Sequence, residues 1–214
     1  MFSKQYAEHY DSFHQKKPYR KEAEFVYKWA NKPGSILDIG CGTARHWRYW
    51  PEAMVRGVEI SQAMIDRSPY KSEIFRCDAQ SLPPFKFKYD LVTMLFDVIN
   101  YIPKHDWWGK LPIKNGGYLV FDTWDSEKIK KDGFSQSFRK FNGISRKVNP
   151  LHLTWDRDIE LKLLVNDGVS EFVEIHKMFL YSHDDILESA GNEFQLIDIK
   201  ETKTWQIWYK FQKK

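Results

Sequence analysis

A short apolar segment that stops at a pair of glycines constrains the fold of this chain most. Residues 35–39 have the composition of a buried strand, Gly40-Cys41-Gly42 interrupts it, and residues 44–50 can continue as a helix. The same alternation predicts further strands at 55–60, 74–77, 90–96 and 118–121. Repeated strand–helix units of this length predict an α/β fold, in which a parallel sheet carries helices on both faces.

Local signals predict the elements that connect these strands. Pro33-Gly34 should end a helix that begins at Tyr19, and Ser61 should cap a helix after the second strand. Residues 106–111 are expected to form a short helix, and Gly116-Gly117 a turn before the fifth strand.

Beyond Asp125 the pattern changes. Apolar and polar residues alternate over 159–165, Asn166-Asp167-Gly168 is typical of a hairpin turn, and residues 172–181 should return as the partner strand. Residues 137–148 are expected to add a third strand. We therefore expect an antiparallel β insertion after the fifth strand.

The last part of the chain is expected to complete the sheet. Ser182 and Asp185 have the spacing of a capping box, which predicts a helix that ends at Gly191. Two strands, at 194–199 and 205–211, should follow. The sheet would then have seven strands, most of them parallel.

Length and composition limit the classes of protein that fit. A chain of 214 residues with 42% hydrophobic and 29% charged residues fits one globular domain. Its 33 basic and 29 acidic residues leave a net charge of only +4, so nucleic acid is not implied as a partner. Cys41 and Cys77 should be free thiols, and neither a signal peptide nor a membrane span is evident, which predicts a soluble cytoplasmic protein. No histidine or cysteine spacing indicates a metal site.

The residues around the glycine turn indicate which ligand it can take. A dinucleotide fingerprint would require a third glycine where Arg45 stands, and Asp38 would place a carboxylate near a pyrophosphate. A bare glycine turn is an open alternative. A ligand that carries an ammonium and a sulfonium but no pyrophosphate, such as S-adenosylmethionine, suits Asp38 better.

Two further acids end successive strands of the predicted sheet. Glu59 follows the glycine turn by about 20 residues, where a carboxylate can accept both hydroxyls of a ribose. Asp78 ends the third strand and can accept from the amino group of an adenine, although it could equally cap a helix. Acids at three successive strand ends favour a nucleoside ligand.

These segments resemble the class I S-adenosylmethionine-dependent methyltransferases. The resemblance covers residues 36–120 and includes the first motif at 36–44, the ribose motif at 58–61, the adenine motif at Asp78-Ala79 and the fourth motif at 89–101. Ala44 departs from the family, where a third glycine is common. The resemblance implies a Rossmann-like fold, with S-adenosylmethionine as cofactor, held by Tyr19, Asp38, Gly40, Cys41, Gly42, Glu59, Ile60, Met64, Asp78, Ala79 and Phe96.

A closer similarity, to small-molecule N-methyltransferases that act on nucleotide-linked amino sugars, extends over most of the chain. It rests on Tyr10-Asp11, His14, Lys17, Tyr19 and Glu22-Ala23, on the fourth motif, and on the insertion. It implies a small polar acceptor with an amine, and leaves a homodimer open. It also implies one domain with a helical lid at 1–32, a cofactor-binding core at 33–124, an insertion at 125–181 and sheet completion at 182–214.

An amine acceptor must lose a proton, so a base or hydrogen-bond acceptor is expected near the methyl group. The candidates are Tyr10, Asp97, Tyr101 and His176. The tyrosines may equally pack against helices, His176 is more commonly a half-buried strand residue, and the segment around Tyr10 is too polar to be core. A basic run could bind a diphosphate or form a solvated surface; it comprises Lys128, Lys130, Lys131, Arg139, Lys140, Arg146 and Lys147.

Other functions fit the same fold. The loop Asp97-Val98-Ile99-Asn100-Tyr101 lacks the proline pair of amino-methylating DNA enzymes, so that class is disfavoured. O-methylation of a small molecule or glycan, tRNA methylation and a non-catalytic cofactor-binding subunit stay open. Turnover of the methyl donor with a panel of amino sugars would separate an enzyme from such a subunit.

Overall fold

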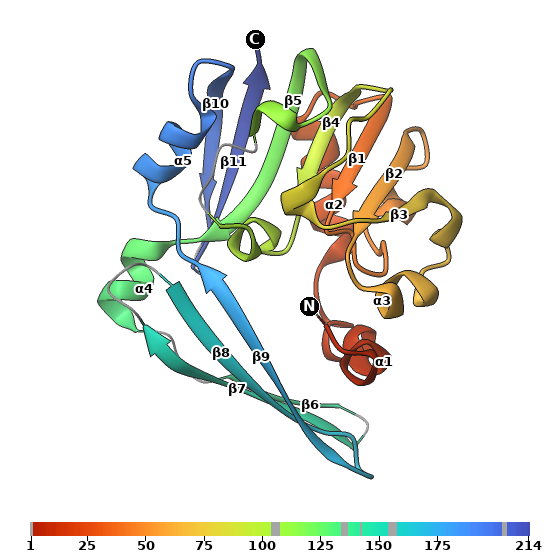
Figure 1. The fold of residues 1–214 in the computed structure, drawn as a ribbon, viewed down its shortest axis with the longest axis vertical. Helices are drawn as coiled ribbons and strands as arrows, with labels where there is room; N and C mark the ends of the chain where they lie inside the picture. Colours follow the sequence, from red (N-terminus) through yellow and green to blue (C-terminus); the bar gives the residue numbers. More distant parts are fainter. Residues whose placement is uncertain (1, 104–107, 134–136, 142, 154–157, 203–204) are drawn as a thin grey trace.

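The computed structural model describes residues 2–103, 108–133, 137–141, 143–153, 158–202 and 205–214. Its main sheet has seven strands in the order β10-β11-β5-β4-β1-β2-β3 (Figure 1). Strands β5, β4, β1, β2 and β3 are parallel to one another, whereas β11 runs antiparallel to both of its neighbours, β5 and β10. The strands are β1 Ser35–Ile39, β2 Met54–Glu59, β3 Ile74–Arg76, β4 Tyr89–Met94, β5 Ile113–Trp124, β10 Phe194–Glu201 and β11 Gln206–Lys213.

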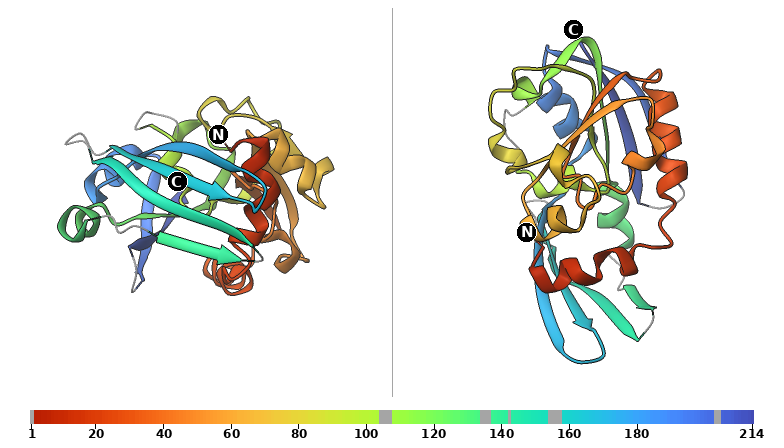
Figure 2. Two further views of the ribbon diagram at one scale, coloured as in Figure 1. Left: turned by 90° about the horizontal axis from the view of Figure 1, so that it is seen from below. Right: turned by 90° about the vertical axis from the view of Figure 1, so that its right-hand side faces the viewer.

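The insertion after β5 forms a separate four-stranded antiparallel sheet, called the second sheet below. Its strands follow the order of the chain, so each is hydrogen-bonded to the next. They are β6 Ser137–Phe141, β7 Ile144–Leu153, β8 Asp158–Asn166 and β9 Glu171–Phe179. Figure 2 shows the second sheet projecting below the main sheet, with α1 lying across it. The predicted fold, a mostly parallel seven-stranded sheet with an antiparallel insertion, is confirmed.

Helices and short 3-10 turns connect the strands. The α-helices are α1 Lys4–Phe13, α2 Tyr19–Trp29, α3 Gln62–Arg67, α4 Ser126–Asp132 and α5 His183–Ala190. The 3-10 turns are η1 Trp47–Tyr49, η2 Lys71–Glu73, η3 Ala79–Ser81, η4 Val98–Tyr101 and η5 Trp108–Lys110. The predicted capping box is present, because the Ser182 hydroxyl and the Asp185 carboxylate each bond the other's backbone N–H. No helix in the described ranges is long and apolar enough to cross a membrane.

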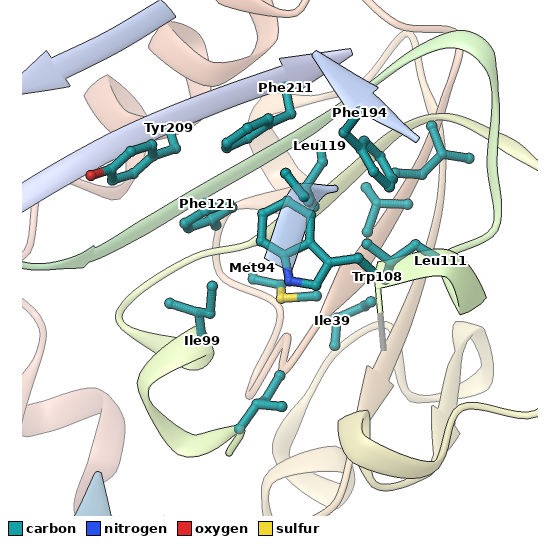
Figure 3. Packing of buried hydrophobic residues seen from close by; sticks show 14 of the residues in the cluster. Ile39, Met94, Ile99, Trp108, Leu111, Leu119, Phe121, Phe194, Tyr209 and Phe211 are labelled. Carbon is teal, nitrogen blue, oxygen red and sulfur yellow. The ribbon is translucent and has the colours of Figure 1, made fainter. Parts of the chain in front are cut away.

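Apolar side chains cover both faces of the main sheet. On one face, Trp108 packs edge-on against Phe121, Phe194 and Phe211, with ring centroids 5.2 to 5.7 Å apart (Figure 3). On the other face, α2 packs against a cluster that includes the buried Trp50. Truncation of a tryptophan in such a position costs about 3 to 5 kcal/mol. Helices on both faces leave the carboxyl edge of the parallel strands as the open edge of the sheet.

A second core lies between α1 and the second sheet. Its members include Tyr6, Ala7, Tyr10 and Phe13 from α1, together with Val148, Ile159, Leu161, Leu163, Val165 and Met178. The expectation that the segment around Tyr10 is too polar for core is wrong, because its aromatic residues recur at helical spacing and share one face of α1. The polar residues of α1 occupy the opposite face.

Three further local predictions are corrected. Residues 44–50 form only η1 because Ala44 adopts a left-handed φ of 59°, which ends regular helix. Gly116-Gly117 lies inside β5 as an irregularity, since the pairing with β4 skips residues between Ile113 and Tyr118. Residues 137–148 belong to two strands, β6 and β7, and Gly143 between them has a φ of 82° that a turn can use. Residues 106 and 107 of the expected short helix lie outside the described residues.

Candidate active site

The glycine turn lies at the carboxyl edge of the main sheet, directly after β1. Gly40 and Gly42 have φ values of 68° and 58°, which glycine adopts without strain. A Cβ on Gly40 would meet the Val98 side chain at 2.6 Å, and one on Gly42 would meet the Met64 side chain at 3.3 Å. Gly40 is therefore required by packing against η4, whereas Gly42 keeps its backbone N–H turned toward Glu59.

Asp38 anchors the glycine turn from within the sheet. Its Oδ1 accepts from the Thr93 hydroxyl at 2.8 Å, and its Oδ2 accepts from the Trp47 indole at 2.9 Å. Burial raises the pKa of Asp38, and these two hydrogen bonds oppose the rise. The indole bond also explains why the chain after Ala44 turns tightly back toward β1. Asp38 thus has a structural role in anchoring the turn, and its role in binding the cofactor stays a prediction.

Glu59 ends β2 and joins the glycine turn to the start of α3. Its two carboxylate oxygens accept from the backbone N–H groups of Gly42, at 3.0 Å, and Ser61, at 2.8 Å. Burial raises the pKa of Glu59, while these donors favour its ionised form. Each oxygen has a second lone pair, so a vicinal diol at this edge can donate to both.

The other predicted cofactor residues follow β2 and β3, with Asp78 and Ala79 from the adenine motif after β3. Asp78 is half-buried, and its Oδ1 accepts from the Gln80 N–H at 2.9 Å. It therefore caps η3, which is the alternative role considered for it in the sequence. Ala79 packs against the main core, and Ile60 accepts from the Arg76 side chain through its carbonyl at 3.4 Å. Met64 is buried beneath Gly42. These residues surround the far end of the edge that begins at Gly42.

A pocket opens beside the glycine turn and gathers seven of the predicted residues. It is lined by Tyr10, Tyr19, Asp38, Gly40, Cys41, Gly42, Thr43, Arg45, His46, Leu95 and Phe96. The Tyr19 hydroxyl is buried and makes no hydrogen bond of ordinary geometry with the described residues, although the Arg45 guanidinium lies over its ring at 4.5 Å. A buried donor next to a cation suits a ligand carboxylate, so the pocket fits the amino-acid end of S-adenosylmethionine.

Asp97 follows Phe96, which lines this pocket, and forms an acid pair with the buried Asp122. It has a left-handed φ of 61°, and its N–H donates to the Asp122 carboxylate at 3.2 Å. Burial and the neighbouring charge of Asp122 raise the pKa of Asp97 well above its ordinary value. Asp122 also accepts from the Gln206 amide at 2.7 Å, which favours its ionised form. Burial and the charge of Asp122 thus disfavour the ionised form of Asp97.

Tyr101 and His176 form a hydrogen-bonded relay with a third residue. The Tyr101 hydroxyl lies 3.0 Å from Nδ1 of His176, and Nε2 of His176 lies 3.1 Å from the Glu174 carboxylate. Burial raises the pKa of Glu174, but hydrogen bonds from His176 and Ser3 outweigh it and lower the pKa overall. An ionised Glu174 orients the imidazole so that Nδ1 faces Tyr101 as an acceptor.

The N-terminal residues cover this relay. The ring of Phe2 lies 4.9 Å from the His176 ring and 5.3 Å from the Tyr10 ring, and its carbonyl accepts from the Ser61 hydroxyl at 3.2 Å. Tyr10 lines the glycine-turn pocket on one side and joins the aromatic cluster on the other. The segment therefore bridges the carboxyl edge and the second sheet.

Glu174 is a site residue that sequence analysis missed. Glu174 and His176 are two positions apart on β9, so their side chains share one face. Thr43, Arg45 and His46 were also missed as pocket residues, because the segment after Gly42 was expected to be helical. Most of the predicted basic run is exposed or partly exposed, which agrees with a solvated surface; Arg146 differs because it is buried. The Arg139 side chain lies outside the described part of the chain.

Comparison with known proteins agrees with this geometry. Residues 36–111 match a family model described as a methyltransferase domain. A comparison with curated protein sequences gave no match. The family match covers the strands that supply the glycine turn, Glu59 and Asp78.

Solved structures share the fold over the whole chain. An S-adenosylmethionine-dependent methyltransferase from Clostridium acetobutylicum is 21% identical with a TM-score of 0.80, and each chain is covered to 97%. DesVI of Streptomyces venezuelae is 18% identical with a TM-score of 0.81 and 98% coverage of both chains. CalS10 of Micromonospora echinaspora, an amino pentose methyltransferase, is 18% identical with a TM-score of 0.75 over 100% of this chain and 98% of its own. The fold of these methyltransferases is thus shared by this chain.

Proposed function

We propose that this methyltransferase transfers the methyl group of S-adenosylmethionine to the amine of a small polar acceptor, a sugar or a similar metabolite. The observation that carries the proposal is that one edge of the main sheet joins two sites. The glycine-turn pocket with Glu59 suits the cofactor, and the Tyr101–His176–Glu174 relay lies beside it, covered by Phe2. The solved structure of CalS10, described as an amino pentose methyltransferase with bound S-adenosylmethionine, supports the same acceptor class.

The cofactor residues divide the ligand between them. Gly42 and Glu59 suit the ribose, Asp78 suits the adenine amino group, and Tyr19 with Arg45 suits the carboxylate. When bound, S-adenosylmethionine supplies a methyl group on a sulfonium, and transfer to nitrogen leaves the neutral thioether. Because this is an in-line displacement, the protein contributes chiefly alignment.

The relay gives the acceptor proton a path. The amine nitrogen forms its bond to carbon with its lone pair, so the nitrogen must release a proton before or after transfer. Tyr101 can accept that proton while its own hydroxyl proton passes to Nδ1 of His176. The Glu174 carboxylate then stabilises the imidazolium from Nε2.

Turnover with matched acceptors tests the proposal. Amino sugars should yield S-adenosylhomocysteine and an N-methyl product, whereas the corresponding sugars with a hydroxyl in place of the amine should not react. Tyr101→Phe should lower turnover by roughly 10- to 100-fold with unchanged cofactor affinity, as loss of one proton-transfer group does. Tyr27→Phe, a change at a partly exposed position of α2, is the control. Methylation of the hydroxyl analogues alone would favour O-methylation, and cofactor binding without turnover of any acceptor would favour a non-catalytic subunit.

A further inference from the structure

The second sheet presents a mostly apolar face to α1, and three of the buried residues that the structure describes on it are polar. Residues on this inner face alternate along each strand, and most are aliphatic, as in Leu161 and Leu163. The exceptions are Arg146 on β7 and the relay residues Glu174 and His176 on β9. Glu174 and His176 form a hydrogen bond with each other. Arg146 is therefore the polar residue on this face that the relay does not explain.

Arg146 is a buried cation without an anionic partner in the described residues. Arg146 is only 9% exposed. Its Nη1 donates to the Tyr6 hydroxyl at 2.7 Å and lies 3.4 Å from Nε2 of His14. Its guanidinium carbon lies 5.6 Å from the Phe13 ring, and Nε has no hydrogen-bond partner. A hydroxyl and a ring do not offset the desolvation of a full charge, which is why buried arginines are normally paired with acids.

The position of Arg146 connects it to the transfer site. Its partner Tyr6 stacks on Phe2 at 5.0 Å, and the same Phe2 ring lies 4.9 Å from His176. Arg146 also acts electrostatically on the Tyr101 hydroxyl across this space. Within the core between α1 and the second sheet, Phe2 and Tyr6 thus link the relay to the guanidinium of Arg146.

We propose that Arg146 binds an anionic oxygen group of the acceptor, a carboxylate or a phosphate, while the acceptor amine lies at Tyr101. This inference rests on the proposed function and narrows it to amines that also carry a negative charge. The planar guanidinium forms paired hydrogen bonds with either group, and its free Nε is one of the two donors that such a pair needs. In this proposal the acceptor takes the place of the Phe2 ring, which packs against His176.

Anion-dependent thermal stability tests the site without any acceptor. Inorganic phosphate and acetate, each compared with chloride at equal ionic strength, should raise the Tm of the wild-type protein by about 2 to 4 °C at saturating concentration. Arg146→Met should abolish the rise. Lys147→Met is the matched control, because Lys147 is the exposed neighbour on the same strand and its loss changes the net charge equally; this variant should keep the rise. No rise in the wild type, or an equal rise in Arg146→Met, would overturn the proposal.

Transfer to matched acceptors identifies the anionic group. Glucosamine, glucosamine 6-phosphate and muramic acid present the same amine with no anion, a phosphate and a carboxylate. Arg146→Met should raise KM for at least one anionic acceptor by about 10- to 100-fold with little change in kcat, and Arg146→Lys should restore part of the loss. KM values that change equally for glucosamine would contradict an anion anchor. Calorimetry with S-adenosylhomocysteine on the same proteins separates this failure from that of the proposed function, which predicts unchanged cofactor affinity in every variant.

Discussion

Replacement of Glu59 by glutamine tests the junction between the fold and the cofactor site. The carboxylate accepts one backbone N–H on each oxygen, from Gly42 at 3.0 Å and Ser61 at 2.8 Å. Glutamine retains one acceptor oxygen, and its amide would oppose the second N–H with donors of its own. The variant therefore loses one charge-assisted hydrogen bond in the apo protein and, in the proposed role, one to the ribose.

The two losses have different magnitudes. A hydrogen bond to a charged group contributes about 1.5 to 3 kcal/mol, which corresponds to a roughly 10- to 150-fold weaker Kd for the cofactor product. For folding, the lost bond is partly offset because glutamine avoids the desolvation that raises the pKa of Glu59. We expect a net destabilisation of about 1 kcal/mol, or roughly 2 to 4 °C in Tm.

Calorimetric titration with S-adenosylhomocysteine and thermal unfolding measure these effects on the same sample. Glu188→Gln, an exposed change on α5, is the control and should leave Kd and Tm unchanged. A wild-type Kd in a folded Glu59→Gln protein would refute the ribose assignment. A Tm lowered by far more than 4 °C would instead show that Glu59 acts mainly through the turn.

Three other variants have defined outcomes. Burial and Asp122 raise the pKa of Asp97, so its contribution to stability is present below the ordinary aspartate pKa and is lost as pH rises; Asp97→Asn should therefore raise Tm at pH 8 relative to wild type more than at pH 5. Trp47→Phe removes the indole donor to buried Asp38 and should cost about 2 kcal/mol, or roughly 4 to 8 °C in Tm, measured by thermal unfolding. Tyr10→Phe should lower turnover by roughly 10- to 100-fold at normal Tm, and lowered stability with normal turnover would assign Tyr10 a packing role only.

The sequence predicts the elements whose signals are local. Strand β1 at Ser35–Ile39 has the predicted bounds, because a strand buried on both faces is a continuous apolar run that glycine interrupts. Helix α5 begins and ends as predicted, since Ser182, Asp185 and Gly191 supply both caps within the segment itself. The carboxyl edge of the sheet, and with it the candidate cofactor site, follows from these elements.

Features that depend on distant contacts could not be predicted. The Trp47 indole in the 3-10 turn donates to Asp38, and no local pattern in the sequence predicts that contact. Arg146 has the same appearance in the sequence as the exposed lysines around it, and only the position of α1 buries it. The spacing of Glu174 and His176 did carry a usable signal, because alternate residues of a strand share a face.

An experimental structure of the complex with S-adenosylhomocysteine tests the central claim most directly. The account predicts that the product lies along the carboxyl edge, with its ribose hydroxyls hydrogen-bonded to Glu59, its adenine beside Asp78 and its carboxylate at Tyr19 and Arg45. A ligand bound elsewhere, or bound at this edge without contact to Glu59, would contradict the account.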